Sequence, residues 1–515
     1  MRSAFIFFAA IGLWACRNDQ KIDLLETKSA EQHRPIYHFT PDSMWMNDPN
    51  GLVFLDGEYH LFYQYYPDST VWGPMHWGHA VSKDLVHWDH MPIALYPDSL
   101  GWIFSGSAVY DQANTSGLGK DGKGPLIAIF THHNAPLEKT GSNLFQYQSL
   151  AYSNDNGRSW TKYPGNPVLP NPGIRDFRDP KVFWYDADQS WRLILAVQNH
   201  VSIYKSLNLL DWTLLSDYGQ NYGSHKGVWE CPDLFPLTDE QGIEKWIMLV
   251  SINPGGPQGG SATQYFVGSF DGSQFIPDHP EMYTEEKAVW LDMGTDNYAG
   301  VTWSNVPESD GRRLFIGWMS NWNYANRVPT QRWRSASTLP RALRLVSNGD
   351  GHLVASSPVS ELRSLEKEGI ELGNLSVYQD TSIYTSETGA MKIDITAVNP
   401  GSGLIAFRIK NLNNEYLDVG FDAEQNRYFV DRTFAGIHDF NESFADFFDT
   451  PVAYPHDTVK MTIYLDVASV ELFADEGKTV MTHIFFPSAP LKEVLVLAET
   501  GNVHLLNASI REMIK

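Results

Sequence analysis

Three short stretches of the sequence place a carboxylate beside a proline at the start of a hydrophobic run. They are Asp48-Pro49 in WMNDPNGLVF, Asp179-Pro180 in RDPKVFW, and Glu230-Cys231-Pro232 in ECPDLFPL. One local pattern at widely separated positions indicates a repeated structural unit. An acid at the same place in several units predicts acids that converge on a common axis and form a catalytic pocket.

Pairs of carboxylic acids are typical of glycosidic bond hydrolysis. One carboxyl protonates the departing oxygen, and the other meets the positive charge that develops at the anomeric carbon. A separation of about 5 to 5.5 Å allows covalent attack with retention, whereas about 6.5 to 9.5 Å leaves room for a water and gives inversion. The sequence leaves this distance open.

Composition excludes several functional classes. At 515 residues, we expect two packed cores. The formal charge is −23 and no lysine-arginine run occurs, so a nucleic-acid backbone would be repelled and a neutral polar substrate fits better. The only cysteines are Cys16 and Cys231, without metal-ligand spacing, so we expect no metal site and no cofactor.

The N-terminus predicts export. Residues 4–13 are an apolar run too short to span a bilayer, which is typical of a secretory signal. Leu13-Trp14-Ala15-Cys16 resembles a bacterial lipoprotein processing site, so we expect residues 1–16 to be a lipoprotein-type signal, with a lipid on Cys16. Residues 17–33 would be a polar tether to a membrane, in the periplasm or at the cell surface. Plain secretion is the alternative.

A repeated pair of elements organises residues 34–345. A long hairpin occurs five times, with strong turn signals at Asp56-Gly57 and Asp310-Gly311. Four of these hairpins are followed by a short apolar strand, a polar turn and an aromatic residue, as in AVSKDLVHW. These units indicate four-stranded blades and predict a five-bladed β-propeller.

A propeller would bring the three acids together. The first strand of each blade lies nearest the central channel, and its leading end faces one mouth of that channel. Asp48, Asp179 and Glu230 precede the expected first strands of blades one, three and four. We therefore expect them to ring the same funnel.

The pattern changes after residue 345. Residues 346–372 combine polar turns with a short helix-like run and are expected to form a linker. Period-two alternation in runs such as MKIDITAV predicts a β-sandwich over residues 373–515. Its expected role is structural support or accessory sugar binding. The predicted fold class is all-β, an N-terminal five-bladed β-propeller plus a C-terminal β-sandwich.

Residues 45–51, WMNDPNG, resemble the signature of glycoside hydrolase family 32, the family of levanases, inulinases and invertases. Four further segments resemble family motifs in the expected order: FSGS from Phe104, FRDP from Phe177, WECPD from Trp229 and SVELFADEG from Ser469. The resemblance covers both predicted domains.

The resemblance implies a role for each acid. Asp48 would be the nucleophile that forms a covalent fructosyl ester, and Glu230 the general acid and then the base. Asp179 would hold two fructose hydroxyls more tightly in the transition state. Arg178 would hold the carboxylates and is expected to depress the pKa of Asp179 or Asp48. Tyr298 would orient Glu230.

Seven further positions match residues that line the first sugar subsite in the family: Trp45, Asn47, Gln64, Trp72, Phe104, Ser105 and Trp318. Cys231 is expected only to pack, because this mechanism needs no thiol. One departure from the family pattern is Asn297, where members commonly carry an aromatic residue between the positions of Asp296 and Tyr298.

The predicted activity is that of a retaining β-fructofuranosidase that releases fructose from levan, inulin or sucrose. One alternative is a surface endo-levanase that releases fructo-oligosaccharides. A five-bladed hydrolase of arabinan or xylan is a second, against which the WMNDPNG and FRDP motifs argue. A non-catalytic fructan-binding lipoprotein is a third. Linkage preference and oligomeric state stay open.

Overall fold

The computed structural model describes residues 31–349, 351–452, 457–498 and 502–515. The expected signal, the lipid site at Cys16 and residues 17–30 of the expected tether lie outside the described residues. Within the described part of the chain, no helix is long and apolar enough to cross a membrane.

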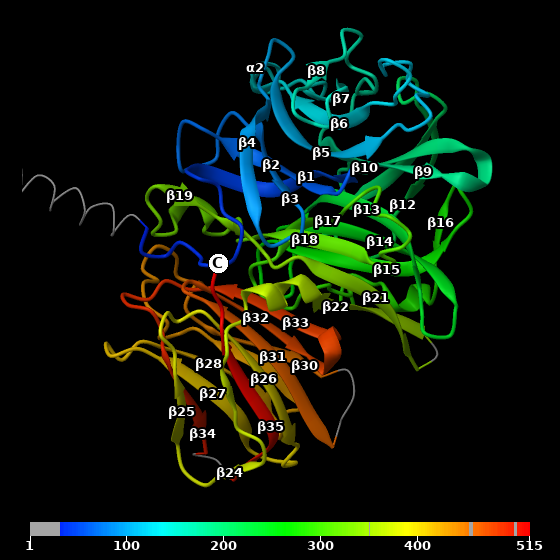
Figure 1. The fold of residues 1–515 in the computed structure, drawn as a ribbon. Helices are drawn as coiled ribbons and strands as arrows, with labels where there is room; N and C mark the ends of the chain where they lie inside the picture. Colours follow the sequence, from blue (N-terminus) through cyan, green and yellow to red (C-terminus); the bar gives the residue numbers. More distant parts are fainter. Residues whose placement is uncertain (1–30, 350, 453–456, 499–501) are drawn as a thin grey trace, which may run out of the picture.

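Five antiparallel sheets follow one another along the chain and form the upper part of the molecule in Figure 1. Blade one contains β1 (Met44–Leu55), β2 (Glu58–Tyr66), β3 (His76–Ser82) and β4 (Trp88–Leu95). Blade two contains β5 (Trp102–Tyr110), β6 (Leu126–His133), β7 (Gln146–Ser153) and β8 (Thr161–Lys162). Blade three contains β9 (Phe177–Tyr185), β10 (Ser190–Val197), β11 (His200–Ser206) and β12 (Thr213–Tyr218).

The remaining two blades complete the ring. Blade four contains β13 (Val228–Thr238), β14 (Glu244–Asn253), β15 (Ala262–Phe270) and β16 (Phe275–Pro277). Blade five contains β17 (Tyr298–Thr302), β18 (Arg313–Met319), β21 (Arg341–Asn348) and β22 (Gly351–Pro358), with the short β20 (Ala336–Ser337) beside β18. The short helical segments among the blades are α2 (Ala135–Lys139), η1 (Asp186–Asp188), η2 (Pro280–Met282) and η3 (Ala325–Arg327).

The first strand of every blade lies innermost. β1 contacts β5, β5 contacts β9, β9 contacts β13, β13 contacts β17, and β17 contacts β1. The ring is closed further by β19 (Trp333–Arg334), which pairs in parallel with the start of β1. The predicted five-bladed propeller is confirmed.

The structure differs from the linker expected at residues 346–372. β21 and β22 pair along their whole length, so the fifth blade extends to Pro358. The polar turn that suggested a linker is the tip of this hairpin. The short helix η4 (Ser360–Leu365) then leads to the second domain and buries Leu362 and Leu365.

Two antiparallel sheets form the C-terminal sandwich, the yellow to red part of Figure 1. One contains β23 (Ile370–Glu371), β24 (Leu375–Val377), β26 (Met391–Val398), β31 (Thr458–Asp466), β32 (Ser469–Ala474), β33 (Thr479–Ile484) and β35 (Val503–Glu512), with η5 (Asp475–Gly477) after β32. The other contains β25 (Thr381–Thr385), β27 (Leu404–Lys410), β28 (Tyr416–Asp422), β29 (Arg427–Asp431), β30 (Phe447–Pro451) and β34 (Glu493–Leu497). Alternate residues of β26 are buried in a core shared by both sheets, which confirms the predicted sandwich.

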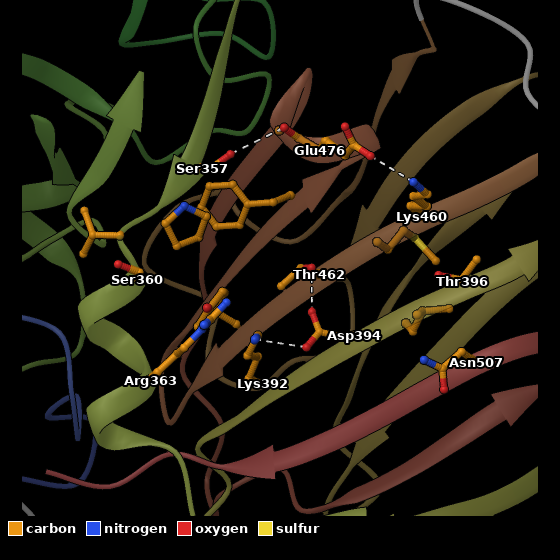
Figure 2. Close-up of a pocket in the computed structure, with 17 residues that line it drawn as sticks. Ser357, Ser360, Arg363, Lys392, Asp394, Thr396, Lys460, Thr462, Glu476 and Asn507 are labelled. Carbon is orange, nitrogen blue, oxygen red and sulfur yellow. Dashed lines mark hydrogen bonds and ion pairs between the residues drawn. The ribbon is translucent and has the colours of Figure 1, made fainter. Parts of the chain in front are cut away.

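A polar cleft of about 380 Å³ lies between the end of the propeller and one sandwich sheet (Figure 2). Ser360 and Arg363 face Lys392 and Asp394 across it. The sheet residues pair with one another, since Lys392 Nζ is 3.0 Å from Asp394 Oδ2 and Thr462 Oγ1 donates to Asp394 at 2.7 Å. These charges are balanced without a ligand.

The central channel of the propeller is blocked partway along its length. Lys181 Nζ is 3.0 Å from Asp233 Oδ2 and donates to the carbonyl of Thr302 at 2.6 Å, so β9, β13 and β17 are joined across the axis. A void of only about 10 Å³, about the room of one water, separates Lys181 from Asp179 and Cys231. Beyond the ion pair, the opposite mouth is a separate cavity of about 660 Å³.

Candidate active site

Asp48, Asp179 and Glu230 lie in β1, β9 and β13, near the entering ends of three innermost strands. The thiol of Cys231 lies between two of them, with Sγ 3.6 Å from Oδ2 of Asp48 and 3.6 Å from Oδ2 of Asp179. Arg178 Nη2 is 3.0 Å from Glu230 Oε1. The fold therefore gathers acids from three blades into one cluster.

A β-bulge in each innermost strand aims these side chains. In every blade the ladder slips so that two residues of the first strand oppose one of the second: Asn47-Asp48, Phe104-Ser105, Asp179-Pro180, Cys231-Pro232 and Ala299-Gly300. Asp179 and Cys231 have positive φ, +65° and +45°. Proline fits there because it donates no ladder hydrogen bond. Bulges next to active sites commonly redirect side chains, which explains the acid-proline pattern.

Polar neighbours from blades one and two fix the carboxylate of Asp48. Ser105 Oγ donates to Oδ2 at 2.6 Å, and Asn47 Nδ2 donates to Oδ1 at 3.1 Å. Trp45 Nε1 donates in turn to Asn47 Oδ1 at 2.7 Å. This chain of bonds leaves Asp48 little freedom to rotate, while its side chain stays partly exposed.

Burial and mutual repulsion perturb the acids. Burial and the charge of Glu230 raise the pKa of Asp48 to about 6, although hydrogen bonds from Ser105 and Asn47 lower it. The pKa of Asp179 is raised to about 7, because burial together with the charges of Glu230 and Asp48 outweighs Arg178. As expected, Arg178 lowers the pKa of Asp179, but it does not bring that pKa below its usual value. One guanidinium 4.0 Å from Asp179 does not offset burial beside two other acids.

Glu230 is oriented from two sides. Arg178 donates to Oε1 from Nε at 3.1 Å and from Nη2 at 3.0 Å, and the Tyr298 hydroxyl donates to Oε2. Arg178 is held by Asp176, whose Oδ1 accepts from Nη1 at 2.7 Å. Burial and the charge of Glu230 raise the pKa of Tyr298 well above its usual value, so the hydroxyl remains a donor.

The aromatic residues of the predicted subsite divide into an outer and an inner set. Trp72 is exposed and Phe104 partly exposed, with ring centroids 6.1 Å apart. Trp45 and Trp318 are fully buried behind the surface, 6.1 Å apart. Gln64 is also buried, and its amide donates to the carbonyl of Ile103 at 3.1 Å. Trp45, Trp318 and Gln64 therefore support the site from behind in this structure.

Two residues contribute to the site although the sequence did not predict them as site residues. Trp322 is partly exposed and covers the inner pair, with its ring 5.8 Å from Trp45 and 4.9 Å from Trp318. The available signal is the WMSNW run, in which one tryptophan lies near the end of a buried strand and the second follows just after it. Cys231, expected only to pack, also contacts two acids. Burial and the nearby Asp179 and Asp48 charges raise its pKa well above its usual value, so the thiol stays neutral.

Comparison with known proteins places the chain in one enzyme family. The family models described as the glycosyl hydrolases family 32 N-terminal and C-terminal domains match residues 38–357 and 359–512. A levanase from Bacillus subtilis is 46% identical over 492 residues, which cover 94% of this chain and 71% of the levanase. An extracellular exo-inulinase from Aspergillus awamori is 39% identical over 510 residues, covering 93% and 94% of the two chains.

Solved structures give the same result. The crystal structure of exo-inulinase from Aspergillus awamori has a TM-score of 0.86 at 36% identity and covers 94% of this chain and 98% of its own. A fructofuranosidase from Schwanniomyces occidentalis complexed with fructose has a TM-score of 0.82 at 33% identity, with 95% and 99% coverage. The chain belongs to glycoside hydrolase family 32.

Proposed function

We propose that the protein is an exo-acting, retaining β-fructofuranosidase that releases fructose from fructan chains. The observation that carries this proposal is the convergence of Asp48, Asp179 and Glu230 above a blocked channel. The levanase and exo-inulinase relatives support fructans as the substrate class.

The first step transfers the terminal fructosyl unit to the enzyme. An oxygen of Asp48 attacks C2 of that unit, the bond from C2 to the leaving oxygen breaks, and Glu230 gives this oxygen its proton. Ser105 and Asn47 hold Asp48 for the attack. Asp179 accepts hydrogen bonds from fructose hydroxyls, which strengthen as charge develops. The products are a fructosyl ester on Asp48 and a shortened chain.

The second step releases fructose. Ionised Glu230 takes a proton from a water, whose oxygen attacks C2 and displaces Asp48 from the ester. Two inversions at C2 leave the anomeric configuration as it began. Arg178 and Tyr298 hold Glu230 in place for both proton transfers.

Isosteric variants test these roles. Asp48→Asn and Glu230→Gln should each abolish fructose release from levan, inulin and sucrose. Glu58→Gln, which removes a blade-one carboxylate paired with Arg158, should leave it unchanged. NMR of the first product should show β-fructofuranose. An active Asp48→Asn variant would refute the assignment of Asp48 as the nucleophile. An α-anomer as the first product would refute retention of configuration.

The products over time test the mode of attack. Fructose alone from the earliest samples is expected, whereas early oligosaccharides would indicate an endo-levanase. Calorimetry provides a separate check. Inulin binding by the wild type without fructose release would contradict the proposal and favour a binding lipoprotein.

We also propose that the protein is exported and lipid-anchored at Cys16, with residues 17–33 as the tether. The support is the apolar run before Leu13-Trp14-Ala15-Cys16 and the extracellular relatives. Labelled palmitate should be incorporated into the wild type expressed in bacteria, and not into Cys16→Ala. A wild type that takes up no label would contradict the lipid anchor and favour plain secretion.

A further inference from the structure

The segment that leads into blade five is held by the C-terminal sandwich. Residues 291–298 run beside β33, an edge strand of one sandwich sheet. Figure 1 shows β33 at the junction of the domains. Met293 N donates to Val480 O at 2.8 Å, and Asp296 N donates to Thr482 O at 3.0 Å. The close approach requires Gly294, because a Cβ there would lie 2.2 Å from Thr482 N.

Two buried aspartates tie this segment to the sandwich through side chains. Asp292 accepts from Thr482 Oγ1 at 2.7 Å and from the Thr482 backbone nitrogen at 3.0 Å. Asp296 accepts from Arg432 Nη1 at 2.9 Å and from the backbone nitrogen of Ile484 at 3.1 Å. The segment therefore depends on sandwich donors for much of its polar pairing.

Arg432 is the most constrained of these donors. Its side chain is fully buried, and it donates to the carbonyls of Phe444 at 2.6 Å and Ile484 at 2.8 Å as well as to Asp296. Its guanidinium also lies 3.9 Å from the ring centroid of Phe444. A planar fork fixed in several directions holds its partner more rigidly than a lysine would.

The segment ends at the residue that contacts the acid/base. Tyr298 follows Asp296 by two positions and donates its hydroxyl to Glu230. Asn297 between them donates to Asp292 Oδ2 at 3.1 Å, so the residue that departs from the family pattern ties the segment to itself. A displacement of Asp296 would be passed to Tyr298 over a very short span of backbone.

We propose that the sandwich domain positions the acid/base of the propeller: Arg432 holds Asp296, which places Tyr298 and through it the carboxyl of Glu230. Arg432, Asp296 and Thr482 are positioning residues. The inference rests on the proposed role of Glu230, and it makes the sandwich a contributor to leaving-group protonation.

Two substrates distinguish a loss of Glu230 positioning from a general loss of activity. The leaving oxygen of sucrose needs a proton, whereas p-nitrophenolate leaves without one. The ratio kcat/KM is the right quantity, since it reports formation of the fructosyl ester alone. For Arg432→Lys we expect a loss of about 10- to 100-fold on sucrose, part of the ~10²–10⁴ that general acid catalysis contributes, and less than about 3-fold on p-nitrophenyl β-D-fructofuranoside.

Matched variants define the route. Tyr298→Phe should reproduce the same pattern, and the double variant with Arg432→Lys should be no worse than Tyr298→Phe alone. Arg312→Lys is the control, because Arg312 bridges Asp310 of the propeller and Glu361 of η4, each at 2.7 Å. Within the described part of the chain, its hydrogen bonds and ion pairs do not reach residues 291–298. This variant should leave kcat/KM unchanged on both substrates.

A second variant keeps the proposal testable if Arg432→Lys does not fold. Thr482→Val removes the hydroxyl that donates to Asp292 but deletes no buried charge, and it should show a smaller loss of the same kind. Equal losses on both substrates in folded variants, or additive losses in the double variant, would overturn the proposal. Wild-type-like Arg432→Lys beside an inactive Glu230→Gln would overturn it while leaving the proposed function intact.

Discussion

Asp48→Asn should remove activity and at the same time stabilise the fold at high pH. The folded pKa of Asp48 is about 6, against an ordinary 3.8. Because the folded pKa is raised, ionisation of Asp48 is harder in the folded state than in the unfolded state. Its contribution to the free energy of unfolding is fully present below pH 3.8 and is lost as the pH rises through 6. The difference corresponds to about 3 kcal/mol at pH 8, an upper value because the side chain is partly exposed.

Asparagine is neutral at every pH and avoids this loss. Its amide offers one acceptor oxygen where the carboxylate offers two, so it accepts only one of the hydrogen bonds from Ser105 and Asn47, at a cost of about 1 kcal/mol. The variant should therefore be more stable by up to about 2 kcal/mol at pH 8 and close to the wild type at pH 4. With an unfolding entropy of about 2.1 cal/mol/K per residue over 515 residues, this is a rise in Tm of up to about 2 °C.

Differential scanning calorimetry at pH 4 and pH 8, at one ionic strength, measures this difference. Asp84→Asn should show the opposite dependence of stability on pH. Burial raises the pKa of Asp84, but hydrogen bonds from His87 outweigh burial and hold it below its usual value. That variant should lose more stability at pH 8 than at pH 4. A Tm difference for Asp48→Asn that is independent of pH, or negative at pH 8, would refute the reasoning.

Three further substitutions follow from the same contacts. Ser105→Ala removes a donor to Asp48, so the pKa of Asp48 should rise above about 6 and the acid limb of the pH profile of kcat/KM on sucrose should move upward; an unmoved limb would contradict this. Arg178→Lys keeps the charge but loses the paired bonds to Glu230, and we expect kcat on inulin to fall about 100-fold, while an unchanged kcat would exclude this role. Gly294→Ala places a Cβ 2.2 Å from Thr482 N and should lower stability by about 1–3 kcal/mol in urea unfolding; an unaltered midpoint would argue against the tight domain contact.

The parts of the fold that sequence predicts are those with local signals. Turns such as Asp56-Gly57 and the strand-turn-aromatic repeat indicate blades without knowledge of distant contacts. The boundary at residue 346 lacks such a signal, because a hairpin tip and a linker share the same polar residues. Only the pairing of β21 with β22 separates the two, and that pairing depends on the rest of the blade.

The site shows the same division. The acids are predictable from their Asp-Pro and Cys-Pro neighbours, whose bulges are local features. The pKa of Asp179 is not, because Arg178 is adjacent in sequence whereas Asp48 and Glu230 come from other blades. The hydrogen bond from Arg432 to Asp296, two residues before Tyr298, is likewise a contact between domains that no local pattern indicates.

The ion pair of Lys181 and Asp233 makes the acids the floor of a blind funnel. A polysaccharide enters such a funnel by its end, and the freed fructose leaves through the same mouth. The remaining chain must withdraw before the next cut, so successive cuts fall on different molecules. With levan chains of uniform length, we expect all chains to shorten together, so that no chain is consumed while others keep their starting length.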